Sequence, residues 1–224
     1  MLTKAFVCTL SAGALLAGCM ADGQPGDALE LGEASSELLA LSNRVGPSVH
    51  NICINGTAFT GAFSTALNNA IASYDALALT FRFTRTTGST VGCNAVITAR
   101  VLPDFGIGSG FPSGGLPYNT LGLGSGFGIH NNAVLTHIIT HLLGHDIGLV
   151  HSDVGPATPV SCGPDQDIIP NFGGSGQGGS GVGVVIIPGT PSPTPGGSVM
   201  NTCVPASTNG RFTSSDISGL NYYY

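Results

Sequence analysis

Hydrophobic and polar residues follow regular patterns from about residue 48 onward, and these patterns predict discrete helices and strands. Apolar residues recur at spacings of three and four across residues 63–74, which predicts an amphipathic helix because such residues share one face. Segments rich in β-branched and aromatic residues predict strands at 49–54, 79–84 and 95–102. We expect a further, exposed strand at 118–124.

A second helix is predicted at residues 133–147. Asn131 or Asn132 supplies its N-cap, because an amide oxygen can accept a hydrogen bond from the free N–H groups of the first turn. Gly148 follows the last turn, where a left-handed residue commonly ends a helix. A strand, a helix, further strands and this second helix predict an α+β domain.

Segments rich in Gly, Ser and Pro interrupt the regular patterns. They predict a loop at 105–115, a flexible linker at 173–183 and a Pro-rich connection at 187–197. Beyond them we expect a short C-terminal helix from Ser215, with Ser214 or Ser215 as its N-cap.

The first residues have the features of an export signal: a cation at Lys4, a short apolar run over residues 5–16, and small residues after it. The run is too short to span a bilayer. Residues 16–19, Leu-Ala-Gly-Cys, resemble a bacterial lipobox, in which Cys19 becomes the lipidated first residue. By the same resemblance, Met20 in place of Asp implies the outer membrane or cell surface. An ordinary signal peptide cleaved nearby is the alternative, and it implies a secreted protein.

This interpretation divides the chain into a signal peptide (1–18), a polar tether or short pro-segment (19–45) and one domain (46–224). The mature chain would retain five Arg against twelve Asp and Glu, a net charge of about −7. Because no cluster of Lys or Arg occurs, we expect no nucleic-acid partner. Contact with a membrane is expected only through the lipid on Cys19.

The chain has six cysteines. Removing Cys8 with the signal and assigning Cys19 to lipid leaves four, an even number that predicts two disulfides in an oxidising compartment. The pairs that we favour, each within one half of the domain, are Cys53–Cys93 and Cys162–Cys203. A cysteine-ligated metal site is the alternative, but no CxxC spacing supports it.

Three histidines at a characteristic spacing predict a metal-binding site. His141 and His145 lie four residues apart on the predicted helix, so both imidazoles project from one face and can bind one ion. Gly148 allows the chain to reverse sharply and bring His151 round as a third ligand. Three protein ligands with an open fourth position are the arrangement of a catalytic zinc ion. We expect His137, one turn before His141, to be neutral and partly exposed.

This spacing resembles the metzincin signature H-E-x-x-H-x-x-G-x-x-H followed by a methionine turn, for which Met200 in Ser-Val-Met-Asn is the candidate. Residues 110–120, 187–190 and 212–222 narrow the resemblance to the myxobacterial protease B family, the dual-action HEIGH metallopeptidases, over residues 46–224. The resemblance implies a metzincin-like fold with a mixed sheet, an active-site helix and a C-terminal helix. It also implies a Zn²⁺ cofactor, peptide or protein substrates, and Met200 as the hydrophobic floor beneath the zinc ligands.

The chain departs from this pattern at the second position, where Leu142 stands in place of Glu. In a zinc peptidase that Glu accepts a proton from water and passes it to the departing amine, which Leu cannot do. Asp146 lies one turn further along the same face, but about 6 Å away along the axis and with a shorter side chain, so it is a poor substitute. Asp153 is either a metal-site residue, as a further ligand or as a hydrogen-bond partner of a ligand, or an ordinary turn residue.

The sequence therefore predicts an exported zinc metallopeptidase of metzincin type that is impaired at its general base. The alternative is an inactive zinc-binding pseudopeptidase at the cell surface, which pairs an extended peptide with the strand at 118–124. A metal-free surface protein on the same fold is the third hypothesis.

Overall fold

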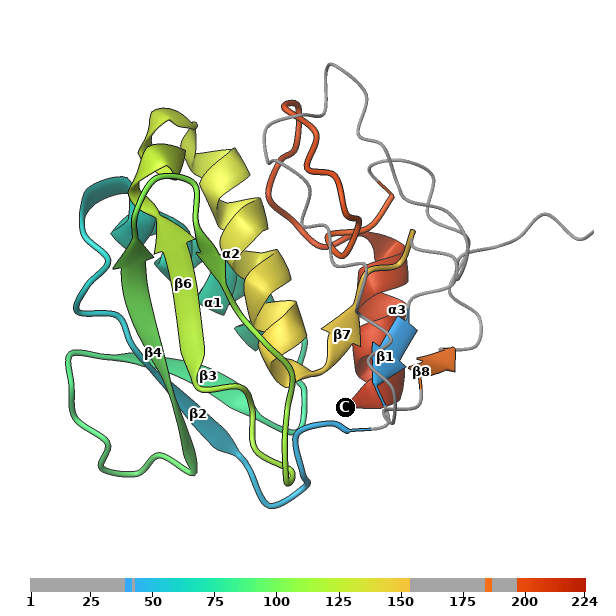
Figure 1. Cartoon of the computed structure of the whole chain (residues 1–224). Helices are drawn as coiled ribbons and strands as arrows, with labels where there is room; N and C mark the ends of the chain where they lie inside the picture. The colour runs from blue at the N-terminus through green and yellow to red at the C-terminus, as the bar shows by residue number, and fades with distance from the viewer. Residues whose placement is uncertain (1–38, 42, 154–183, 187–196) are drawn as a thin grey trace, which may run out of the picture. The chain divides into compact units, whose positions relative to one another are not determined.

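The structure is a computed structural model that describes residues 39–41, 43–153, 184–186 and 197–224 (Figure 1). The predicted signal peptide with its lipobox, most of the predicted tether and nearly all of both predicted linkers lie outside the described residues.

A five-stranded sheet forms one layer of the fold, with the strand order β3-β2-β4-β6-β5. Its members are β2 (Asn51–Asn55), β3 (Arg82–Thr86), β4 (Ala95–Leu102), β5 (Ile107–Gly108) and β6 (Thr120–Gly124). The first four strands in this order pair in parallel, and β5 pairs antiparallel with β6. The sheet is mixed, as the family resemblance implied.

Two expectations about this sheet were wrong. The predicted loop at 105–115 contains β5, whose pairing with β6 depends on glycines: a Cβ on Gly122 would lie only 3.0 Å from the Cα of Gly108. The strand predicted to be exposed is interior, because β6 lies between β4 and β5 and is buried from Leu121 to Gly124.

Helices α1 (Gly61–Asp75) and α2 (Asn132–Ile147) pack against each other beside the sheet (Figure 1). The face of α1 that the spacing predicted is buried: Phe63, Leu67, Ile71 and Tyr74. Every residue of α2 from Val134 to Ile147 is buried, and a helix buried all round needs neighbours on more than one side. Helix α1 is one such neighbour, since the Tyr74 hydroxyl donates to the Thr140 carbonyl at 2.9 Å. The C-terminal segment is another, since the Tyr224 hydroxyl donates to the Ile147 carbonyl.

Both ends of α2 are formed as the sequence predicted. The Asn131 side chain is the N-cap and accepts a hydrogen bond from the Val134 amide at 3.0 Å. Gly148 has φ of 118°, and its amide donates to the carbonyls of Gly144 and His145. The left-handed conformation turns the chain out of the helix directly into β7 (Leu149–Val150).

A second, three-stranded sheet follows this turn, with the antiparallel order β7-β1-β8. Strand β8 spans Val184–Ile186, and β1 spans Leu39–Leu41. Strand β1 therefore falls within residues 19–45, which the sequence assigned to a tether. The assignment missed this three-residue strand because it is defined by its two partners, which lie more than a hundred residues further along the chain.

The last helix, α3 (Ser214–Tyr223), begins at a different cap from the one expected. Thr213, rather than Ser214 or Ser215, is the N-cap, and it forms a reciprocal capping box with Asp216. An acid three residues after the cap can bond the amide of the cap residue, which favours Thr213 over the two serines. A short 3-10 helix, η1 (Ser125–Ile129), connects β6 to α2.

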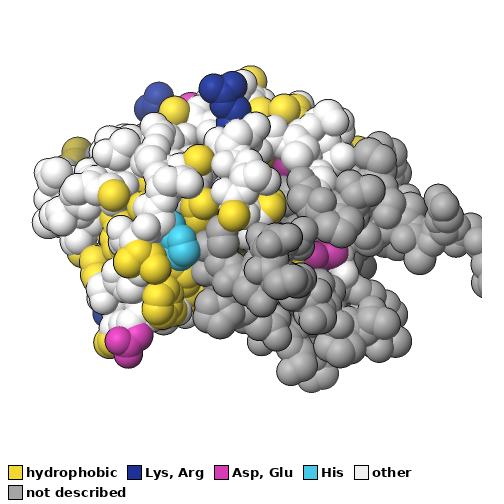
Figure 2. Space-filling model, turned by 90° about the horizontal axis from the view of Figure 1, so that it is seen from above, with side chains coloured by type: hydrophobic (Ala, Val, Ile, Leu, Met, Phe, Trp, Pro, Cys, Tyr) yellow, Lys and Arg dark blue, Asp and Glu magenta, His cyan; other side chains and the backbone are white. Residues whose placement is uncertain are grey.

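The scarcity of charged residues and the presence of cysteines in the sequence are both reflected in the described structure. On the described part of the face in Figure 2, few Lys, Arg, Asp or Glu side chains are seen among the hydrophobic side chains and the white backbone and other side chains. Cys53 and Cys93 are disulfide-bonded, as predicted. Cys203 is also in a disulfide, while Cys162, its predicted partner, lies outside the described residues. None of the helices in the described part of the chain has the length and apolar character that a membrane span requires.

Candidate metal centre

Three buried imidazoles converge where α2, β7 and the chain after β7 meet. His141 and His145 project from α2, and the turn at Gly148 brings His151 back toward them. The Nε2 atom of His151 lies 3.1 Å from Nε2 of His141 and 3.3 Å from Nε2 of His145. Of the described residues, these three form the group of side chains able to hold a metal ion. The structure thus brings together all three of the predicted ligands.

Backbone carbonyls fix the orientation of the two imidazoles on α2. The Nδ1 atom of His141 donates to the Val199 carbonyl at 2.7 Å, and Nδ1 of His145 donates to the Leu149 carbonyl at 2.8 Å. A carbonyl can only accept, so each Nδ1 carries the proton and each neutral ring keeps its lone pair on Nε2. Both lone pairs thus belong to nitrogen atoms that converge on His151 Nε2, which is the arrangement expected around a cation.

Burial keeps these rings in the neutral form that binds metals. It lowers the pKa of His145 to about 4 and that of His151 to about 3, and it also lowers the pKa of His141, with further lowering by the neighbouring histidines. Neutral imidazole is the ligand form. Three such donors, two of them oriented through a hydrogen bond on their other nitrogen, suit Zn²⁺.

Met200, the residue predicted to be the floor of the site, packs against α2. It is 1 % exposed, and it packs against Gly144, between the two ligands of α2, so closely that a Cβ on Gly144 would stand 2.5 Å from its Sδ. Its turn is closed by a hydrogen bond from the Asn201 amide to the Ser198 carbonyl at 3.2 Å.

The segment that carries His151 is tied to this methionine turn. The Ser152 amide donates to the Met200 carbonyl at 3.0 Å, and the Ser152 hydroxyl donates to the Asn201 side chain at 2.7 Å. The Asp153 carboxylate accepts from the amide and the hydroxyl of Thr202, each at 2.8 Å. The described hydrogen bonds of the Asp153 side chain are thus those from Thr202. Asp153 anchors the third ligand's segment to the turn.

Leu142 and Asp146 lie one turn apart on the same face of α2, next to the face that carries His141 and His145. Leu142 is 0 % exposed and belongs to the hydrophobic core. Asp146 is also 0 % exposed; one of its carboxylate oxygens accepts from the Gly110 amide at 3.3 Å. Burial raises the pKa of Asp146 well above its ordinary value, although the Gly110 hydrogen bond lowers it.

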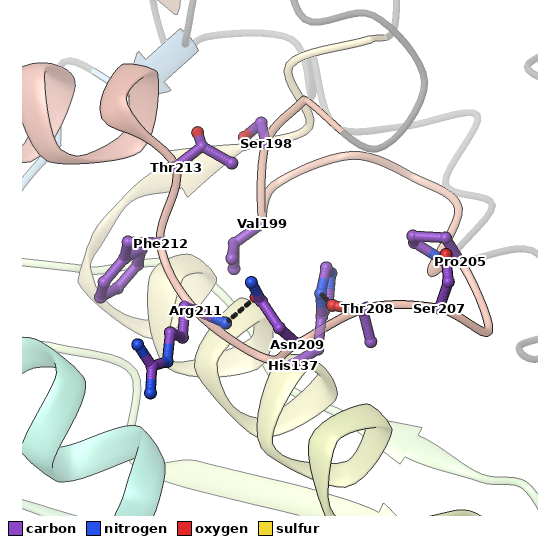
Figure 3. Close-up of a pocket in the computed structure, with 10 residues that line it drawn as sticks. All are labelled: His137, Ser198, Val199, Pro205, Ser207, Thr208, Asn209, Arg211, Phe212 and Thr213. Carbon is purple, nitrogen blue, oxygen red and sulfur yellow. Dashed lines mark hydrogen bonds between the residues drawn. The ribbon is translucent and has the colours of Figure 1, made fainter.

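His137 was expected to be partly exposed, and this was wrong. It is 4 % exposed, because the chain at residues 205–213 packs over it. Its Nδ1 atom lies 2.8 Å from the Thr208 hydroxyl, and its ring lines a cavity of about 500 Å³ together with Val199 and Asn209 (Figure 3). Burial lowers the pKa of His137 to about 4, so the ring is neutral, as expected.

Sequence reasoning missed the groups that orient the ligands. The carbonyls of Val199 and Leu149 are backbone atoms, and no residue type marks them in advance. Asp216 was also missed, although Thr213-Ser-Ser-Asp216 is a recognisable capping pattern. Its carboxylate reaches back to the methionine turn.

Comparisons with known proteins agree with this geometry. The family model of the dual-action HEIGH metallopeptidases matches residues 10–224. A structure of myroilysin superposes with a TM-score of 0.51 at 13% identity, covering 83% of this chain and 98% of that one. A crystal structure of myroilysin gives a TM-score of 0.35 at 16% identity, over 49% of this chain and 46% of that one. This second match is too weak to support a conclusion about the fold. No curated protein sequence matches. The first superposition confirms the predicted fold class.

Proposed function

The chain belongs to the dual-action HEIGH metallopeptidase family, and on that premise we propose that it is an exported zinc-dependent metallopeptidase whose proton-transfer step is impaired. The observation that carries this proposal is the combination of an intact histidine triad with Leu142 in the buried core beside it. His141, His145 and His151 would hold the ion. When bound, zinc acts as a Lewis acid toward a peptide carbonyl and makes water more acidic.

Leu142 removes the group that would handle the proton. Hydrolysis of an amide needs a base that takes a proton from the attacking water and an acid that gives it to the leaving amine. A fully buried leucine among apolar neighbours does neither.

The carboxylates on the elements around the site are poor replacements. Asp153 is engaged by Thr202 and Asp216 by the methionine turn. Asp146 is oriented toward Gly110, and its raised pKa favours the protonated form, which cannot accept a proton. The described structure therefore supports very slow turnover rather than a relocated base.

A zinc-binding pseudopeptidase is the second candidate, and the same buried Leu142 favours it. In that case the family's peptide-binding surface would serve to bind peptides or partners without cleaving them. The strand expected to pair with such a peptide, β6, is already flanked on both sides. An added peptide strand would instead have to pair along the outer edge of β5, which offers only Ile107 and Gly108.

We further propose that the protein acts outside the cytoplasm, anchored by lipid on Cys19. The Cys53–Cys93 disulfide supports an oxidising compartment. The lipobox-like residues 16–19 support the anchor, and residues 19–38 would then form the tether ahead of β1.

Zinc content and peptide hydrolysis measured on one preparation test the proposal. We expect about one zinc per chain, removable by a chelator, together with very slow hydrolysis that stops when zinc is removed. Zinc without any hydrolysis, but with binding of unfolded casein, would favour the pseudopeptidase. A chain without zinc would contradict both. If turnover proves fast, Asp146→Asn would show whether Asp146 supplies the base.

A further inference from the structure

Residue Val199 connects the C-terminal helix to the metal centre. Its carbonyl accepts the Nδ1 proton of His141 at 2.7 Å, and its own amide donates to the Asp216 carboxylate at 3.0 Å. Val199 is 1 % exposed, so both of its polar groups depend on these protein partners. The orientation of His141 is therefore linked, through one residue, to the first turn of α3.

Asp216 does more than cap its own helix. One carboxylate oxygen accepts from the amide and hydroxyl of Thr213, at 2.8 and 2.9 Å, and this completes the capping box. That oxygen also accepts from the Val199 amide, and the other oxygen accepts from the Ser198 hydroxyl at 2.5 Å. Asp216 is 1 % exposed. Two of its four hydrogen bonds thus leave α3 and hold the residues just before Met200.

The same turn is held at its other end by Asp153, through Thr202. The two carboxylates come from different segments, one from α3 and one from the segment of His151. Only the Asp216 side reaches the residue whose carbonyl contacts a ligand.

We propose that Asp216 is a positioning residue of the metal centre, which fixes the Val199 carbonyl and thereby holds His141 with its Nε2 lone pair toward the ion. This inference rests on the proposed zinc function. A ligating imidazole keeps its orientation and tautomer through the hydrogen bond on its other nitrogen. If Val199 is released, the carbonyl can turn away, and His141 loses that constraint.

Three variants separate positioning from helix capping. Asp216→Ala removes the acceptor for Val199 and also removes half of the capping box. Thr213→Ala removes the N-cap but leaves Asp216 able to bond Val199 and Ser198. Asp216→Asn keeps an oxygen that can accept a hydrogen bond from the Val199 amide. Its NH₂ group would donate to the Ser198 hydroxyl, which already accepts a hydrogen bond from the Met200 amide.

The measurements are the zinc dissociation constant, by chelator competition, and the visible absorption of the cobalt-substituted protein. We expect Asp216→Ala to weaken zinc binding by about 10- to 100-fold and to change the cobalt bands. Thr213→Ala should bind as wild type does despite its lower stability, and Asp216→Asn should recover most of the affinity.

An equal loss of zinc affinity in Asp216→Ala and Thr213→Ala would overturn the inference, because the helix cap alone would then explain the effect. Unchanged zinc affinity in both variants would overturn it as well. If Asp216→Ala does not fold, Asp216→Ser decides, because its side chain stays polar but is too short to reach the Val199 amide: weaker zinc binding supports the inference and unchanged binding overturns it. If the wild type binds zinc and the variants bind it with the same affinity as the wild type, only this inference fails. A wild type that binds no zinc defeats the proposed function as well.

Discussion

Met200 packs directly against Gly144, at the point of α2 from which His141 and His145 project. A Cβ on Gly144 would stand 2.5 Å from the Met200 Sδ and 3.2 Å from its Cε. The contact exists because glycine has no side chain. The helix is therefore packed against Met200 between its two ligands.

Gly144→Ala should lower the free energy of unfolding by up to about 2 kcal/mol. Overpacking costs about 1–3 kcal/mol, and the better helix propensity of Ala returns about 1 kcal/mol. Urea denaturation of the zinc-loaded protein measures the difference. In a Met200→Ala background the same substitution should stabilise instead, because the methionine is gone. An equal effect of Gly144→Ala in both backgrounds would refute the contact.

His145→Ala should abolish stoichiometric zinc binding, because it removes the ligand between His141 and His151 in the chain. The matched control is His50→Ala, which removes an exposed imidazole just before β2 and should leave zinc content unchanged. Native mass spectrometry of both variants reads the result. One zinc per chain in His145→Ala would end the triad assignment.

His137 should contribute to acid sensitivity. Its folded pKa, about 4, is below the unfolded value near 6.5, so below pH 6.5 the unfolded chain takes up this proton more readily and stability falls as the pH falls toward 4. A shift of this size corresponds to about 3 kcal/mol.

His137→Asn keeps a polar group near Thr208 but does not titrate. Its stability should therefore fall less steeply than that of wild type between pH 6.5 and 4, by urea denaturation in one buffer series. Parallel profiles for the two proteins would show that His137 is not held neutral.

Cys19→Ala should release the protein from membranes, since its acyl chains would be the anchor. Fractionation of expressing cells into membrane and soluble pools measures this, with Cys8→Ala as the control that leaves the lipobox intact. Unchanged membrane association of Cys19→Ala, or a lipid-free mature N-terminus in wild type, would contradict the anchor.

Local signals allowed the metal centre to be predicted from the sequence. The spacing of His141 and His145, the cap at Asn131 and the turn at Gly148 all act within a few residues of α2, and the structure has each of them. The strand at 95–102 was likewise predicted with its observed bounds.

Contacts between distant segments could not be predicted in this way. Val199 bonds a ligand 58 positions earlier, and Thr208 covers His137 from 71 positions away. Strand β1 is defined only by its pairing with strands more than a hundred residues away. Short apolar or polar runs carry no periodicity that reveals such partners.

The central claim is that this chain has a metal centre without its general base, and Leu142→Glu tests it. The matched control is Leu142→Gln, which has the same shape and a similar burial cost but cannot accept a proton. Both variants must first be shown to fold and to bind zinc, because position 142 is fully buried.

The measurement is the zinc-dependent rate of peptide hydrolysis by wild type and both variants. A restored acid–base group is typically worth about 10²–10⁴-fold, so we predict a gain of that order for Leu142→Glu and none for Leu142→Gln. A folded, zinc-loaded Glu variant no faster than the Gln variant, or a wild type that already hydrolyses peptides as fast as the Glu variant, would contradict the account.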